Sequence, residues 1–247
     1  MHNHHPKILE LLFCPLVILS AQSGIEIVEK VDDNRVVQSM SYTATMKIGM
    51  TGKVREKSFE GYAQGEELAY IEFTAPARDK GTRFLMIEDE MWMYIPAVEK
   101  ATKIAGHMLR QSLMGSDFSY DDLTENERLQ DAYGITLLGS DTVASTDCYL
   151  LELTAKVEEV TYYKRKMWVS KETYVPLKTE LYAKSGKLMK EVSVLETQNI
   201  GERRYPVRVR MENKLRKETF TELILEGIHI DVSVPSRVFT KAYLERK

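Results

Sequence analysis

Residues 40–63 decide the fold class, because their apolar side chains recur at every second position. The stretch reads MSYTATMKIGMTGKVREKSFEGYA. The apolar members of its first half, which alternate with polar residues, are Tyr42, Ala44, Met46, Ile48 and Met50. This period is typical of a strand with one buried face. Thr51-Gly52 is a turn sequence, and a second strand is expected over 54–63, so the stretch predicts an antiparallel hairpin.

The same pattern continues through the chain after one helix, expected over 25–37. Further strands are expected at 68–74, 84–87, 91–95, 133–139, 147–156, 161–170, 175–184, 187–199, 205–214 and 217–228. About twelve closely spaced strands predict a mainly β protein with a few helices. We expect one large, strongly curved antiparallel sheet, an incomplete β-barrel. Since no linker divides the chain, residues 24–247 are expected to form a single domain.

The first 23 residues are typical of a secretory signal peptide. Lys7 precedes an apolar run over 11–19, and Ala21 and Ser23 fit the small positions before a signal peptidase site. The run is about half of the ~20 residues that a membrane-spanning helix needs. We therefore expect export to the periplasm and removal of residues 1–23. The alternative is a buried N-terminal helix.

Composition excludes several classes of protein. The chain has 247 residues, a net charge of −3 and 43% hydrophobic residues, so it can form a core and lacks the basic excess of a nucleic-acid-binding protein. After removal of the signal peptide, the histidines are His107 and His229, and Cys148 is the lone cysteine. We therefore expect no internal disulfide, no metal site and no cofactor.

Catalytic motifs are also missing from the sequence. It contains no G-x-S-x-G, no G-x-x-x-x-G-K and no G-x-G-x-x-G, so neither a nucleophile elbow nor a nucleotide site is indicated. The acidic groups Asp121-Asp122 and 88–90 are interpreted as solvated clusters, because adjacent residues point apart. We expect no enzyme activity. A lipid hydrolase stays an alternative that would need a Ser/His/Asp arrangement.

Residues 105–123 interrupt the strand pattern with a segment too apolar for a solvated loop. Asp117 or Ser119 is a candidate cap for a short helix over 120–123. An apolar, helical insertion between strands of an open sheet suggests a lid over its concave face. The alternative is an ordinary connection that packs on the core.

Methionine is frequent, and its flexible thioether suits surfaces that accept varied apolar shapes. Together with neighbouring leucine and aromatic residues, these methionines predict a lipid-binding surface on the sheet and the lid. The candidate lipid-binding residues are Met46, Met50, Phe84, Met91, Trp92, Met93, Tyr94, Met108, Leu109, Leu113, Met114 and Phe118. The alternative is that they fill an ordinary core. Arg208 and Arg210 share a strand face and are expected at solvated outer positions. The alternative is that they bind anionic lipid head groups.

An ordered set of motifs over 73–123 resembles the outer membrane lipoprotein-sorting protein family, in the longer branch of the LolA/LolB-like superfamily. The matching motifs are Phe73-Thr-Ala-Pro76, Lys80-Gly81-Thr82, Met91-Trp92-Met93-Tyr94-Ile95-Pro96, Lys100, Ile104 and Gly115-Ser116-Asp117-Phe118-Ser119-Tyr120-Asp121-Asp122-Leu123. The resemblance implies an incomplete antiparallel barrel with a helical lid over an apolar cavity. It also implies that Arg78 or Arg83 bonds to the lid backbone.

The resemblance further implies a non-enzymatic, monomeric periplasmic carrier, or chaperone, that moves lipoprotein acyl chains or other lipids toward the outer membrane. An inner-membrane transporter is a partner that such a carrier would meet, and no nucleic acid is expected. The alternative function is an envelope sensor or interaction protein, in which the same sheet binds a membrane-protein partner.

Overall fold

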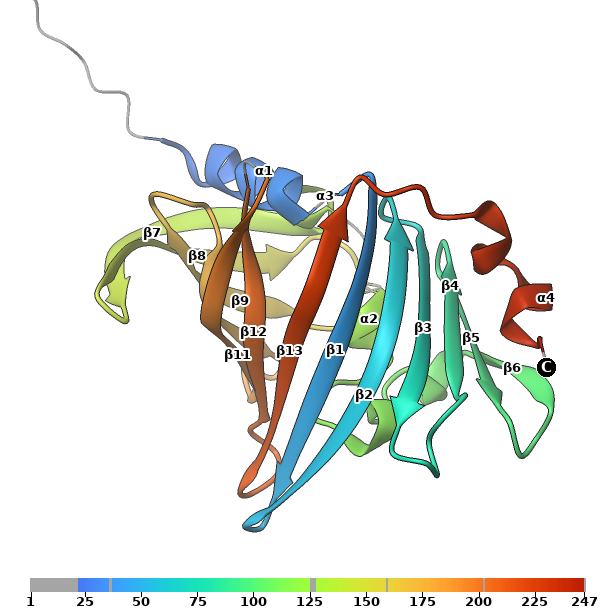
Figure 1. Cartoon of the computed structure of the whole chain (residues 1–247). Helices are drawn as coiled ribbons and strands as arrows, with labels where there is room; N and C mark the ends of the chain where they lie inside the picture. The colour runs from blue at the N-terminus through green and yellow to red at the C-terminus, as the bar shows by residue number, and fades with distance from the viewer. Residues whose placement is uncertain (1–21, 36, 125–127, 159, 202, 247) are drawn as a thin grey trace, which may run out of the picture.

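The computed structural model describes residues 22–35, 37–124, 128–158, 160–201 and 203–246. The expected signal peptide, 1–23, lies outside the described residues except for its last two positions. The described part of the chain forms one antiparallel sheet of thirteen strands that curls without closing (Figure 1). In those residues no helix is long and apolar enough to cross a membrane. The expected fold class, a large curved antiparallel sheet with a few helices, is confirmed.

The strand order follows the sequence within two meanders. Strands β1 to β6 form one meander and β7 to β13 the other, and β1 pairs with β13 where they meet. The strands are β1 (Ser39–Met50), β2 (Lys53–Gln64), β3 (Leu68–Ala75), β4 (Arg83–Ile87), β5 (Glu90–Ile95), β6 (Lys100–Ile104), β7 (Tyr133–Val143), β8 (Thr146–Ala155), β9 (Lys164–Ser170), β10 (Pro176–Tyr182), β11 (Leu188–Ile200), β12 (Arg203–Asn213) and β13 (Thr219–Ile230).

The twelve expected strands all form, and the structure has one further strand, β6, that was not expected from the sequence. Its sequence, Lys-Ala-Thr-Lys-Ile over Lys100–Ile104, has little apolar alternation because β6 is an edge strand. Lysines at such an edge are a common protection against unwanted pairing. The backbone N–H of Ala101 donates to the Glu245 side chain at 2.9 Å, so part of this edge is also capped.

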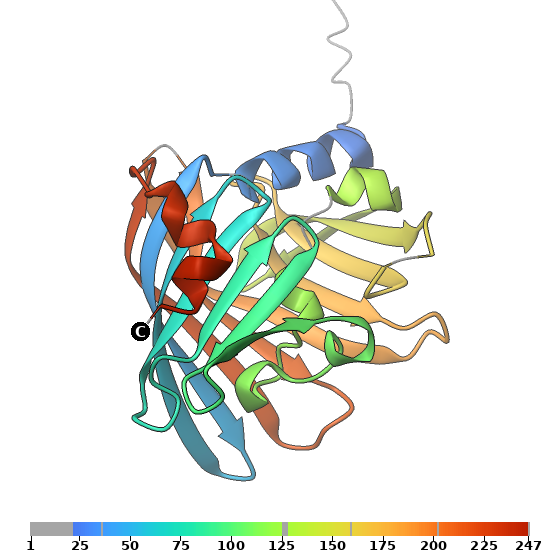
Figure 2. The same ribbon diagram turned by 90° about the vertical axis from the view of Figure 1, so that its right-hand side faces the viewer.

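Short helices cover both the concave, inner face and the convex, outer face of the sheet (Figure 2). Helix α1 (Gly24–Arg35) and α3 (Leu129–Ala132) pack on the inner face of β7 to β9. The 3-10 helix η3 (Ser236–Phe239) and α4 (Lys241–Leu244) cover the outer face of β3 to β5. The remaining helices, η1 (Gly106–Met108), η2 (Leu113–Gly115) and α2 (Asp121–Thr124), lie in the concavity.

Strand register explains how one sheet builds separate cores. In β4, Phe84 and Met86 join a cluster on the inner face, whereas Leu85 joins a cluster under the C-terminal helices. The two sides alternate because successive side chains of a strand point to opposite faces. In β1, Ala44 and Met46 face inward as the alternating pattern predicts.

The inner face is packed so tightly at Gly61 that it leaves no room for a side chain. The Tyr42 ring covers it, and a Cβ at residue 61 would lie 2.3 Å from that ring. Gly134, in β7, has only ordinary contacts around its Cβ position. We expect Gly61→Ala to lower the free energy of unfolding by about 2 kcal/mol through overpacking. Gly134→Ala should cost nothing, as urea denaturation would show. An equal loss in both variants would contradict this packing.

Candidate functional site

The inner face of β1 to β6 and β13 carries a continuous apolar cluster. Its buried members are Ala44, Met46, Ile48, Phe59, Phe73, Phe84, Met86, Met91, Ile104, Leu113 and Tyr120. Aromatic rings form a row within it, with Phe59 and Phe73 at 5.1 Å and Phe73 and Phe84 at 6.0 Å between centroids. Two members, Leu113 and Tyr120, come from the segment between β6 and α3. This segment therefore belongs to the site.

We call residues 105–124 the lid. The lid folds back on itself, since the N–H of Leu113 donates to the carbonyl of Phe118 at 2.8 Å and the N–H of Asp121 donates to that of Leu109 at 2.8 Å. Its tip turns at Met114 and Gly115, both in the left-handed backbone region. The apolar side chains that it lays on the inner cluster are Met108, Leu109, Leu113, Met114, Phe118, Tyr120 and Leu123. The inner face is thus covered by the lid's own side chains.

A buried carboxylate fixes the tip of the lid to β13. Asp117 accepts hydrogen bonds from the hydroxyls of Thr219 at 2.8 Å and Thr221 at 3.0 Å, and its N–H donates to the Thr221 hydroxyl at 2.8 Å. Asp117 was one candidate cap for the short helix, and it bonds to β13 instead. A further bond joins Arg216 to the Ser112 hydroxyl at 3.1 Å.

A second buried carboxylate fixes the end of the lid to β11. Asp122 in α2 forms an ion pair with Lys190 at 2.5 Å, and both side chains are at most one-tenth exposed. Asp122 also accepts from the Tyr162 hydroxyl at 2.6 Å, and from the N–H and hydroxyl of Ser119 at 2.6 and 2.8 Å. Ser119, the other candidate cap, therefore pairs with Asp122 at the start of α2.

The structure brings nine of the twelve candidate lipid-binding residues together. In or against the inner cluster lie Met46, Phe84, Met91, Met93, Met108, Leu109, Leu113, Met114 and Phe118. The other three lie elsewhere. Met50 is 46% exposed at the end of β1, whereas Trp92 and Tyr94 pack on the outer face with the C-terminal helices. Trp92 and Tyr94 alternate with Met91 and Met93 along β5, so their side chains point to the opposite face of the sheet. Lipid binding by any of the twelve stays a prediction.

The arginine that the resemblance assigns to the lid has another role. Arg83 lies on the outer face, donates to the carbonyls of Leu244 and Arg246 at 3.0 and 2.6 Å, and forms an ion pair with Glu72 at 3.1 Å. The expectation that Arg83 bonds to the lid backbone is wrong, because odd positions of β4 point away from the lid. Arg78 is mostly exposed and pairs with Asp79.

The outer face of β10 to β13 is charged, as expected for Arg208 and Arg210. Arg208 is 42% exposed and pairs with Glu222 at 2.6 Å, and Arg210 pairs with Glu212 and Glu222 at 3.0 and 3.3 Å. Both guanidinium groups thus already have acidic partners within the sheet, which leaves them less suited to anionic head groups.

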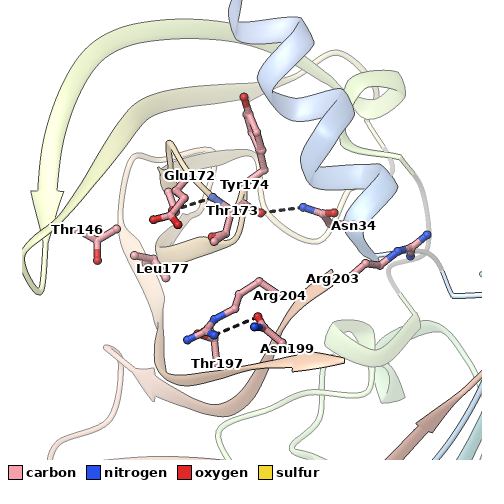
Figure 3. A pocket seen from close by; sticks show the side chains of 11 residues that line it. Asn34, Thr146, Glu172, Thr173, Tyr174, Leu177, Thr197, Asn199, Arg203 and Arg204 are labelled. Carbon is pink, nitrogen blue, oxygen red and sulfur yellow. Dashed lines mark hydrogen bonds between the residues drawn. The ribbon is translucent and has the colours of Figure 1, made fainter. Parts of the chain in front are cut away.

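A polar pocket of 580 Å³ lies away from the lid, between α1 and the ends of β9 to β12 (Figure 3). In it, Arg204 donates to Thr197 at 2.7 Å and Asn199 at 3.1 Å, and Asn34 donates to the carbonyl of Thr173 at 3.0 Å. Its lining is predominantly polar and bonded internally, so it does not match an acyl chain.

The described residues lack a candidate metal site. They contain no group of three histidine, cysteine or acidic side chains placed to hold a metal ion. His107 and His229 are exposed, and Cys148 is buried in β8. No Ser/His/Asp arrangement is formed around Ser119 and Asp122, whose partners are Lys190 and Tyr162.

Comparison with known proteins places the chain in a family. A family model described as "-like: Uncharacterized protein" matches residues 65–246, well over half of the chain. The chain belongs to this family. No curated protein sequence matches it significantly.

Solved structures show the same architecture. The chain is similar to a DUF1329 family protein from Desulfovibrio piger, with 28% identity and a TM-score of 0.84, covering 90% of this chain and 97% of that one. It is similar to a LolA superfamily protein from Nitrosomonas europaea, with 26% identity, a TM-score of 0.75 and coverage of 90% and 100%. A domain described as an outer membrane lipoprotein-sorting protein, from Vibrio parahaemolyticus, has 22% identity, a TM-score of 0.81 and coverage of 90% and 98%. The expected LolA-like fold is confirmed.

The outer-face cluster around Glu72 predicts a pH dependence. Burial would raise the pKa of Glu72, but hydrogen bonds from Tyr70, Arg83 and Arg246 outweigh it and hold the pKa below its ordinary value. A carboxyl with a lowered pKa stabilises the folded state above its unfolded pKa, and this contribution is lost as the pH falls through the folded value. We expect Glu72→Gln to cost about 2 kcal/mol at neutral pH and progressively less in acid.

Urea denaturation of both proteins at about pH 7 and about pH 3 measures this difference. Glu67→Gln, at an exposed position on the β2–β3 turn, is the control and should change little. A cost of Glu72→Gln that is the same at both pH values would contradict the assignment.

Proposed function

We propose that the protein is a non-enzymatic carrier that binds lipoprotein acyl chains, or another lipid, on the inner face beneath the lid. It moves this cargo across the periplasm toward the outer membrane. The observation that carries the proposal is the lid itself, a short segment that places seven apolar side chains on the apolar face of an open LolA-like sheet. Such a covering can be exchanged for another apolar chain without breaking any strand pairing.

The energetics suit a carrier that must also release its cargo. An acyl chain of about fifteen buried methylenes gains roughly 12 kcal/mol, at ~0.8 kcal/mol per CH₂. Displacing the lid exposes its leucine, methionine and aromatic side chains and offsets much of that gain. The small net preference allows loading from one partner, such as an inner-membrane transporter, and release to another.

Export by the N-terminal signal peptide is part of the proposal, and contacts at the start of α1 bear on where the mature chain would begin. Ser23 and Glu26 form a reciprocal cap, in which the N–H of Ser23 donates to the Glu26 side chain at 3.0 Å and the N–H of Glu26 donates to the Ser23 hydroxyl at 3.2 Å. Gln22 accepts hydrogen bonds from Tyr149 and Tyr174 at 3.2 Å. Cleavage after Ser23 would remove both contacts.

Because these contacts stabilise the start of α1, we expect the mature protein to begin at Gln22, with Ala21 as the last residue removed, in place of the Gly24 start that Ala21 and Ser23 indicate in the sequence. N-terminal sequencing of protein isolated from the periplasm measures the cleavage site. A start at Gly24 would contradict the capping argument, and intact protein found in the cytoplasm would contradict export.

Polar substitution in the lid tests the proposed binding mode. We expect Leu109→Gln, Leu113→Gln and Met114→Gln to raise affinity for the neutral probe N-phenyl-1-naphthylamine by about tenfold, because the altered lid competes less well for the inner face. Fluorescence titration measures affinity, and thermal unfolding checks that each variant is folded.

Leu138→Gln is the matched control, since Leu138 is 47% exposed on β7 and outside the lid. Mass spectrometry of lipids that co-purify from the periplasm provides a second readout. Lid variants that bind the probe like the control would contradict the carrier. Lipid-free protein with a tightly bound membrane-protein partner would favour the sensor alternative.

A further inference from the structure

Lys190 is a buried cation on the inner face of the sheet. It lies in β11 opposite Leu181 of β10 and Asn213 of β12, and its side chain is 10% exposed. Two residues along the strand, Val192 pairs with the buried Met211. An ammonium group at the border of an apolar surface is unfavourable unless a counter-charge accompanies it.

The aromatic and basic surroundings of Lys190 belong to the body of the sheet and the β8–β9 connection. Its Nζ lies 5.7 Å from the centroid of the Tyr162 ring, and the guanidinium of Arg165, also buried, lies 5.8 Å from the same ring. Arg165 lies 4.8 Å from the Tyr133 ring as well. Two buried cations therefore flank Tyr162 on the fixed side of the site.

The carboxylate that neutralises Lys190 belongs to the lid. Asp122 lies beside Tyr120 and Leu123, which pack on the apolar cluster. If the lid moves aside, as the proposed function requires, Asp122 would leave with it, whereas Lys190 and Tyr162 belong to β11 and the β8–β9 connection and would stay. Displacement of the lid would thus uncover the apolar inner face and, next to it, the ammonium group of Lys190 from which the Asp122 carboxylate has been removed.

We propose that the cargo is an amphiphile with an anionic head group, and that its carboxylate or phosphate takes the place of Asp122 on Lys190. Its acyl chain then replaces the apolar side chains of the lid. This inference rests on the proposed function, since it requires the lid to yield to cargo. It adds a chemical class to the cargo, because a neutral lipid of equal length would not replace the one ion-pair partner that Lys190 has among the described residues.

Displacement of N-phenyl-1-naphthylamine by ligands of one chain length tests the head group. We expect dodecanoate and dodecyl phosphate to displace the probe at about tenfold lower concentration than dodecanol, the ratio expected of one charge-assisted hydrogen bond. Acetate and inorganic phosphate, which lack the chain, should not displace it.

Variants of the Lys190–Asp122 ion pair test whether Lys190 is the group that recognises the anionic head group. Lys190→Met should remove the preference for dodecanoate over dodecanol, whereas Asp122→Asn should increase it, since no lid carboxylate then competes. Lys178→Met is the matched control, because Lys178 pairs with Glu180 and Glu191 on the outer face and should not affect the preference. Thermal unfolding confirms that each variant is folded.

The outcomes separate this inference from the proposed function. If dodecanoate and dodecanol displace the probe equally well, the anionic class is wrong and the carrier stands. A preference that survives in Lys190→Met likewise overturns the role of Lys190. If no amphiphile displaces the probe, the carrier itself is wrong. Displacement by acetate or inorganic phosphate would assign the site to free anions and overturn the inference.

Discussion

An open sheet that curls this far must cover its inner face, and the rest of the structure depends on how it does so. Two helices cover the inner face of β7 to β9, and the lid covers that of β1 to β6 and β13. The first covering is a separate layer with its own cluster. The second comes from one short segment that is bonded to the sheet through Asp117 and Asp122, and the proposed function requires this covering to be exchangeable.

The bonds that hold the lid are polar and buried at both ends. Asp117 bonds to β13 and Asp122 to β11, so the lid is fixed to the second meander although it follows the first in sequence. Buried polar bonds of this kind define position more than they add stability, since desolvation cancels much of their gain. They therefore give the lid one closed arrangement, and opening it would break these bonds as well as the apolar contacts.

Much of this could be predicted from the alternation of apolar residues. All strands except β6, and the lid segment, followed from local pattern, and nine of the candidate lipid-binding residues lie together because Met46, Phe84 and the lid share the inner side. The sequence did not reveal which face of the sheet Trp92 and Tyr94 are on. Their strand, β5, is apolar on both faces, so its pattern does not distinguish the face under the lid from the face under the C-terminal helices. Lys190 was missed because a lysine on a strand is most often exposed, and its burial is explained by contacts from distant parts of the sequence, above all with the lid's Asp122 and Ser119.

The pairing of β1 with β13 has a consequence for how the chain folds. Every other pairing joins strands that follow one another in sequence, so each meander can form hairpin by hairpin with short loops to close. The last strand must arrive before the first can find its second neighbour. Until then one edge of β1 lacks its partner strand, so its backbone N–H and C=O groups are without their final hydrogen bonds. The order of the strands thus delays completion of the fold until the whole chain is available.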